Sequence, residues 1–325
     1  MPKSRIRRAA MAVVIALAPG PVLAAPLVVA TTGMAGDLVA TIGGDCIDAE
    51  VLMGPGVDPH LYQATASDVR AFQKAELIVY NGFGLEGQLA DVLAGLDRHK
   101  ATLAVAEAAA RAGPIEALDG EASYATDPHL WMQPALWSQA VPAVEAALAR
   151  LAPDCLEPMQ RRAAAYRQQL QSLDRWMAAS LATIPSGQRV LLTAHDAFGY
   201  LSQGYGLEVR GVQGISTQAE PSVAAIQSVA DLIAQRNIPA VFIETTINPR
   251  TVEAVIEAAR ARGTDVEVGG SLYGDALGQP GTLADTLVGM LIHNTRVMTD
   301  ALGGQVIPLP EALAPWQQRR EEVAP

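Results

Sequence analysis

Several motifs that identify common protein classes are absent from this chain of 325 residues. It has only two cysteines and no C-x-x-C pair, which excludes a dithiol redox motif and a thiolate zinc site. No G-x-S-x-G, H-E-x-x-H or P-loop sequence occurs, so the usual signatures of serine hydrolases, zinc proteases and P-loop NTPases are missing. No apolar run is long enough to cross a membrane, which needs about 20 residues.

The composition is that of a folded, acidic protein. Half of the residues are hydrophobic and 18% are charged, and the length predicts about two domains. The formal net charge is −11. A surface this acidic repels nucleic acid and anionic lipid, so neither is expected as a partner, whereas a cationic ligand is compatible with it.

The N-terminus has the pattern of an export signal. Four basic residues precede an apolar run over residues 9–18, a Pro-Gly pair ends that run, and Val22-Leu23-Ala24 supplies small residues for cleavage. We therefore expect a signal peptide over residues 1–24 and a mature chain with 19 basic and 34 acidic residues, a net charge of −15. No cysteine stands directly after the apolar run, where a lipid anchor would be attached, so a periplasmic protein without a lipid anchor is predicted.

The mature chain alternates strand-like and helix-like segments, which predicts an α/β fold with parallel sheets. Residues 25–135 are expected to form an N-terminal α/β lobe, residues 136–184 a helical section, and residues 185–325 a C-terminal α/β lobe. Within the helical section, residues 158–183 predict one helix about 39 Å long that joins the two lobes. The expected strands are 27–30, 47–53, 77–80, 102–105, 189–193, 207–212, 240–244 and 266–269. The expected helices of the two lobes are 36–42, 67–74, 85–96, 223–236, 249–262 and 283–302.

The two cysteines leave two alternatives open. In an oxidising compartment Cys46 and Cys155 could form one disulfide, or they could remain two separate thiols. They are 109 residues apart, and spacing alone does not give their geometry.

The most specific local feature is a repeated tetrapeptide, Asp-Pro-His-Leu, which contains His60 and His129. Proline restricts the backbone, so each histidine sits on a stiffened loop. His195 follows the expected strand 189–193, and Asp275 lies in the loop after strand 266–269. Three of these four residues, all but His129, lie on loops that leave the carboxyl ends of strands, where open α/β sheets bind ligands. Two come from each lobe, so we expect the four to converge between the lobes. Three imidazoles and one carboxylate suit a divalent transition metal.

Two other histidines and one glycine motif have simpler interpretations. His99 is expected in a solvated turn, and His293 in the packing or capping of the last long helix. Residues 82–87 read Gly-Phe-Gly-Leu-Glu-Gly, a literal dinucleotide fingerprint after a strand. The export signal and its place in the third βα unit instead favour a tight turn.

The main alternative function is a secreted metal-dependent hydrolase. Three histidines and a metal-bound water would make a catalytic zinc site. Asp275 as a fourth ligand would occupy the position of that water. A hydrolase would therefore have three protein ligands and a water on the metal, whereas a site that only binds the metal would have four protein ligands.

Taken together, the motifs resemble the zinc/manganese substrate-binding proteins of metal ABC importers, the cluster A-I or TroA-like family. The resemblance covers nearly the whole mature chain. The motifs that carry it are G-P-G-V-D-P-H-L-Y (54–62), D-P-H-L-W (127–131), T-A-H-D-A-F-G-Y (193–200), Q-G-I-S-T (213–217) and G-D-A-L-G (274–278).

The resemblance implies a non-enzymatic periplasmic receptor, expected to be a monomer, that delivers one metal ion to a membrane permease and its ATPase. Its implied ligands are His60, His129, His195 and Asp275. Family branches that favour manganese usually have a carboxylate where His195 stands, so the nitrogen-rich set favours Zn²⁺, with Mn²⁺ second. Because ligating imidazoles must be neutral, affinity is expected to fall as the pH drops through the histidine range near 6.5.

Overall fold

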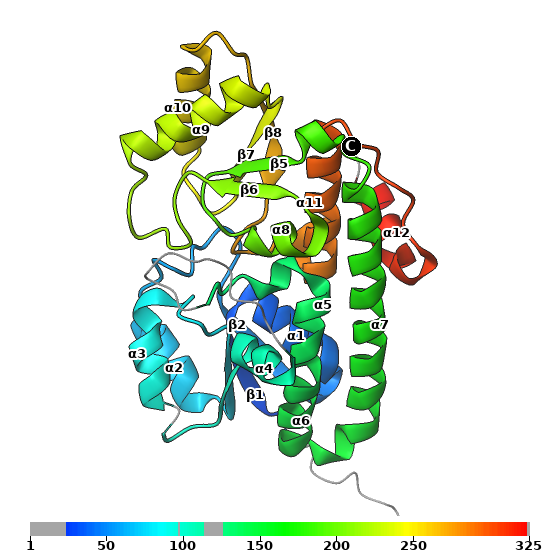
Figure 1. The fold of residues 1–325 in the computed structure, drawn as a ribbon. Coiled ribbons are helices and arrows are strands. Elements are labelled where there is room, and N and C mark those ends of the chain that lie inside the picture. The colour runs from blue at the N-terminus through cyan, green and yellow to red at the C-terminus, as the bar shows by residue number, and fades with distance from the viewer. Residues whose placement is uncertain (1–23, 97, 114–125, 324–325) are drawn as a thin grey trace, which may run out of the picture.

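The structure, a computed structural model, describes residues 24–96, 98–113 and 126–323. In this part of the chain two α/β lobes lie one above the other beside a single long helix, α7 (Figure 1). The predicted fold class is therefore confirmed. Almost all of the expected signal peptide, residues 1–23, lies outside the described residues. No helix of the described chain is both long and apolar enough to cross a bilayer.

The N-terminal lobe is built on one parallel sheet with strand order β2-β1-β3-β4. Apolar side chains fill the middle of the sheet, because strands covered on both faces are apolar throughout. Its strands are β1 (Leu27–Thr32), β2 (Asp48–Met53), β3 (Leu77–Tyr80) and β4 (Thr102–Ala104). Its helices are α1 (Gly33–Gly43), α2 (Ala66–Lys74), α3 (Ala90–Leu96) and α4 (Val105–Ala112).

The C-terminal lobe contains two parallel strand pairs, β5 with β6 and β7 with β8, and β5 lies beside β7. These strands are β5 (Val190–Thr193), β6 (Glu208–Gly211), β7 (Ala240–Glu244) and β8 (Glu267–Leu272). The helices are α8 (Gly199–Tyr205), α9 (Val223–Arg236), α10 (Arg250–Arg260), α11 (Leu287–Ala301) and α12 (Ala314–Val323). The loops that leave β5 and β8 carry two of the candidate ligands.

Helix α7 (Leu156–Leu181) packs against both lobes. Two shorter helices precede it, α5 (Pro134–Trp137) and α6 (Val141–Leu151). Along its length α7 contacts α1 and α6 at one end and α8 and α11 toward the other, so its buried face belongs to a single apolar core that continues from lobe to lobe. The predicted connecting helix is confirmed, displaced by two residues toward the N-terminus.

A disulfide between Cys46 and Cys155 joins the N-terminal lobe to the segment just before α7. This settles the alternative that the sequence left open. Arg162, in the second turn of α7, also donates hydrogen bonds to the carbonyl oxygens of Ile42 and Gly43 at 2.7 and 2.6 Å. The start of α7 is therefore held both covalently and by hydrogen bonds against the end of α1.

The sequence-based element boundaries differ from the structure in a few places. Helices α4, α8 and α12, of 8, 7 and 10 residues, have no counterpart in the sequence prediction. The helix expected over residues 85–96 begins as a 3₁₀ turn, Gly87–Leu89, before α3. Strand β8 extends to Leu272, three residues beyond its predicted end, with an irregular register opposite Val241 and Phe242.

Candidate metal site

His60 lies on the loop that follows β2. Its backbone N–H donates to the Oδ1 atom of Asp58 at 2.8 Å, within the Asp-Pro-His sequence. The other carboxylate oxygen of Asp58 accepts a 2.7 Å hydrogen bond from the hydroxyl of Thr217, a residue of the C-terminal lobe. Asp58 thus links the His60 loop to the opposite lobe.

His129 lies just before the short helices that lead into α6. The Oδ1 atom of Asp127 accepts from its backbone N–H at 2.9 Å and lies 2.6 Å from its ring Nδ1. The backbone carbonyl of Asp127 accepts a 2.8 Å hydrogen bond from Tyr200 in α8. Trp131, which stacks edge-on against the His129 ring, donates to the carbonyl of Gly274 at 3.1 Å. The His129 segment is therefore fastened to the other lobe on two sides.

His195 and Asp275 are supplied by the C-terminal lobe. His195 follows β5, and its backbone N–H donates to Oε1 of Glu244, the last residue of β7, at 2.8 Å. Its ring Nδ1 lies 2.6 Å from Oε2 of Glu244, an ion-pair contact outside regular hydrogen-bond angles. Asp275 lies three residues beyond the end of β8.

The four side chains meet in one buried cluster, as the sequence predicts. The Nε2 atoms of His60, His129 and His195 lie 3.5, 3.3 and 3.1 Å from the carboxylate oxygens of Asp275. One ligand atom from each residue can be chosen so that all lie within 4.8 Å of one another. Every one of the four side chains is almost completely removed from solvent.

These distances fit a single transition-metal ion. Two ligands bound at about 2.1 Å in tetrahedral geometry are about 3.4 Å apart, close to the three histidine–carboxylate separations. In the described chain, the Nε2 atoms of His129 and His195 and both oxygens of Asp275 are buried without a regular hydrogen-bond partner. Such groups are costly unless something binds them. A cation placed among them would satisfy all of them.

The pKa values of the N-lobe histidines are displaced in opposite directions. Burial disfavours the imidazolium ion and lowers the pKa of His60 to about 3, against the attraction of Asp275. Burial acts in the same sense on His129, but the carboxylates of Asp127 and Asp275 outweigh it and raise the pKa of His129 to about 9.

The pKa values of His195 and Asp275, the two candidate ligands of the C-terminal lobe, are displaced by the attraction between their charged forms. Burial opposes the charged form of His195, but Glu244 and Asp275 raise its pKa well above the ordinary value. Burial likewise favours the neutral acid of Asp275, yet the facing imidazoles hold its pKa well below its usual range. Burial and charged neighbours therefore move the pKa values of these histidines away from the unperturbed value near 6.5.

The remaining sequence candidates lie elsewhere. His99 is exposed in the turn after α3. His293, in α11, contacts the carbonyl of Ser271 through Nε2 at 3.0 Å and stacks on Tyr273.

The glycines of residues 82–87 serve a tight turn. The buried carboxylate of Glu86 accepts from the backbone N–H groups of Asn81 and Gly82 at 2.6 and 3.1 Å. A side chain at Gly87 would collide with the His60 carbonyl, because its Cβ would lie 2.2 Å from that oxygen. This close approach, rather than a dinucleotide, explains the glycine that ends the motif.

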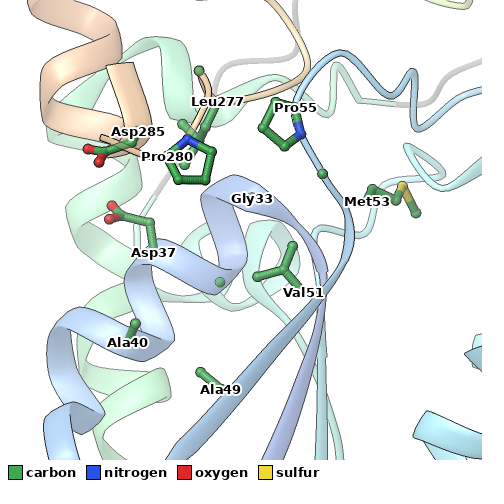
Figure 2. A pocket seen from close by; sticks show the side chains of 13 residues that line it. Gly33, Asp37, Ala40, Ala49, Val51, Met53, Pro55, Leu277, Pro280 and Asp285 are labelled. Carbon is green, nitrogen blue, oxygen red and sulfur yellow. The ribbon is translucent and has the colours of Figure 1, made fainter. Parts of the chain in front are cut away.

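A separate pocket of about 350 Å³ lies between the lobes, beside α1 and β2. None of the four candidate ligands lines it. Figure 2 shows Leu277 and Pro280 above it and the carboxylates of Asp37 and Asp285 at one side of it. Asp37 also accepts a 3.2 Å hydrogen bond from the backbone of Leu287 at the start of α11. This hydrogen bond links α1 of the N-terminal lobe to α11 of the C-terminal lobe.

Sequence reasoning missed Glu244, which contacts His195 twice. The available signal was an acidic residue at the carboxyl end of an otherwise apolar strand, where its burial calls for a partner. It also missed Asp127 as a support of His129, although the residue stands in the repeated tetrapeptide.

The chain resembles known proteins over most of its length. It is 44% identical over 277 residues to the "Zinc-binding protein TroA" of Treponema pallidum, covering 85% of this chain and 89% of that protein. It is 40% identical over 275 residues to the "Manganese-binding lipoprotein MntA" of Bacillus subtilis, with the same coverage of 85% and 89%. A solved structure of the periplasmic zinc-binding protein TroA matches with a TM-score of 0.81 at 44% identity, over 85% of this chain and 99% of that one.

The family comparison agrees with these relatives and with the geometry. None of the relatives named here is described as a hydrolase, so the alternative of a secreted metal-dependent hydrolase has no support. The model of the family described as "Zinc-uptake complex component A periplasmic" matches residues 28–301. The chain belongs to this family.

Proposed function

We propose that this protein captures one Zn²⁺ ion outside the cytoplasm and delivers it to an ABC importer. The observation that carries this proposal is the buried meeting of His60, His129, His195 and Asp275, drawn from both lobes within 4.8 Å. Four protein ligands leave no open position for a catalytic water in a tetrahedral site. The site is therefore suited to holding a metal as cargo and not to hydrolysis.

The ligand chemistry favours zinc, with Mn²⁺ as the second candidate. Three imidazoles and one carboxylate form a nitrogen-rich set, and zinc stands well above manganese in the general affinity order. The relatives' names include both metals, one zinc-binding and one manganese-binding protein. The choice therefore rests on the donor atoms of this site.

The partner that fits this function is an ABC permease with its ATPase, and the compartment that fits it is the periplasm. The family description includes "uptake complex" and "periplasmic". The oxidised pair Cys46–Cys155 suits an oxidising compartment. A monomer without a lipid anchor remains our prediction for this chain, although the relative from Bacillus subtilis is named a lipoprotein.

Elemental analysis of protein purified from the periplasm, followed by competition between zinc and manganese, tests the proposal. We expect one zinc per chain and displacement of manganese by an equal concentration of zinc. Zinc binding lost in a His60→Ala variant but kept in His99→Ala would support the ligand assignment. Copurification without metal, together with no zinc binding in solution, would overturn the proposal.

A further inference from the structure

We propose that Glu244 is a positioning residue for metal capture: it fixes the His195 ring with Nε2 facing the other ligands and holds the two C-lobe ligand loops together. This inference rests on the proposed function. Glu244 is not itself placed as a ligand, because its carboxylate is engaged on the opposite side of the His195 ring, at Nδ1.

The first line of evidence is the double contact with His195. One oxygen of Glu244 accepts from the His195 backbone N–H at 2.8 Å, and the other lies 2.6 Å from the ring Nδ1. Only 4% of Glu244 is exposed, so water does not compete with these contacts. Two contacts to one residue restrict both its backbone and its ring rotation.

The second line of evidence is the position of β7 between the two ligand-bearing strands. Strand β5 leads to His195 and β8 leads to Asp275, and β7 lies beside both. At Gly274, directly before Asp275, a Cβ atom would lie 2.7 Å from Oε2 of Glu244 and 3.4 Å from the His195 ring. The carboxylate is therefore packed between both ligand loops, and only glycine allows this approach.

The chemistry of a carboxylate then determines which ring nitrogen binds the metal. An ionised carboxylate only accepts hydrogen bonds, so the nitrogen facing it must carry the proton. With the proton on Nδ1, the lone pair of a neutral His195 lies on Nε2, 3.1 Å from Asp275. A carboxylate beside a metal-ligating histidine fixes its tautomer and orientation in this way, and removing it typically costs about 10–100-fold in metal affinity.

The Glu244→Gln variant separates orientation from mere space filling. Its amide side chain would keep the shape of the native one, and the amide oxygen could still accept from the His195 N–H. The amide NH₂ group would then face Nδ1 and favour the proton on Nε2, where the metal ligand is needed. Glu244→Gln should therefore weaken zinc binding about 10–100-fold, although it is the conservative replacement. Glu244→Asp keeps an acceptor-only carboxylate on a shorter chain and should lose less affinity.

The test measures zinc affinity by competition with a chromophoric chelator for the full mature chain and its variants. The matched control is Glu267→Gln, the same change at the exposed start of β8. Nitrogen-15 NMR of the zinc-loaded protein reports which nitrogen of His195 carries the proton, and melting of the metal-free protein reports folding.

We expect the affinity order wild type and Glu267→Gln, then Glu244→Asp, then Glu244→Gln, with Nδ1 protonated in the wild type and in Glu244→Asp. Zinc affinity of Glu244→Gln within about twofold of wild type, against the expected loss, would overturn the inference. If Glu244→Gln does not fold, an unchanged affinity of Glu244→Asp overturns it instead. Failure of the wild type to bind zinc would contradict the proposed function, which is a different result.

Discussion

The two lobes hold their central histidines by the same kind of contact, made in two different ways. In the N-terminal lobe Asp127, two residues before His129, engages both its backbone N–H and its ring Nδ1. In the C-terminal lobe the same two groups of His195 are engaged by Glu244, 49 residues away along the chain. A carboxylate from a local motif thus orients the His129 ring, and a carboxylate from a distant strand end orients the His195 ring.

The difference lies in which oxygens make the contacts. Asp127 uses a single oxygen for both contacts, because its short side chain loops back on the following backbone. Glu244 divides the two contacts between its two oxygens from across the sheet. The local solution depends on three consecutive residues, whereas the distant one depends on correct packing of β5 against β7.

The two Asp-Pro-His-Leu segments make different tertiary contacts through their aspartates, Asp58 and Asp127. Asp58 accepts from the His60 N–H as Asp127 does from His129, but its second oxygen receives the Thr217 hydroxyl of the other lobe. The pKa of His60 falls to about 3 while that of His129 rises to about 9. Equal sequences therefore give one histidine that favours the neutral form and one that favours the charged form.

Removing a ligand from either lobe is the largest expected perturbation. His129→Ala and His195→Ala should each weaken zinc binding by more than about a hundredfold, beyond the loss typical of supporting residues. Isothermal titration calorimetry would measure both, with His99→Ala and His293→Ala as controls. Equal, small effects for all four variants would contradict the assignment.

Replacing the local carboxylate tests whether the two supports are equivalent. Asp127→Asn should reduce zinc affinity about 10–100-fold, because an amide can donate to Nδ1 and favour the wrong tautomer. Chelator competition would measure it, with Asp48→Asn, at the exposed start of β2, as the control. A loss comparable to that of Glu244→Gln means equivalent supports; an unchanged affinity would show that backbone geometry alone holds His129.

The pH dependence should expose the charged histidine. Because the pKa of metal-free His129 is raised to about 9, this ring carries a proton at neutral pH that zinc must displace. Affinity should therefore rise with pH, by at least about tenfold per unit below pH 9 for one displaced proton. Asp127→Asn removes one of the two carboxylates that raise this pKa, so His129 should lose its proton at a lower pH in this variant than in the wild type. A zinc affinity that stays constant between about pH 6 and 8, the range in which His129 would hold its proton, would refute this picture.

The smallest expected effect concerns the hydrogen bond from Thr217 in the C-terminal lobe to Asp58 in the N-terminal lobe. Thr217→Val removes the hydroxyl that donates a hydrogen bond to Asp58. Loss of this bond should cost about 1 kcal/mol of binding free energy, or about fivefold in zinc affinity. The loss should appear mainly as faster zinc release, measured by stopped-flow with a chelator. Thr264→Val, in the loop before β8, is the matched control. Release rates that do not change would mean that Asp58 supports His60 without help from the other lobe.

Much of the ligand cluster could be predicted because its residues carry local signals. The two Asp-Pro-His segments restrict their own backbones, and His195 and Asp275 follow strands whose carboxyl ends lie at one edge. The disulfide between Cys46 and Cys155 could not be predicted, since a separation of 109 residues gives no distance between them. Glu244 was missed for a related reason: its partner is found only when β5 and β7 are side by side.

The sequence by itself determined the α/β class, the long connecting helix and the identity of the four candidate ligands, because periodicity and backbone stiffness act over a few residues. Only the tertiary structure decided which carboxylate supports which histidine, how far each pKa moves and which glycine admits a neighbouring loop. Those properties depend on distances of about 3 Å between segments far apart in the chain, and on the burial that makes such contacts strong.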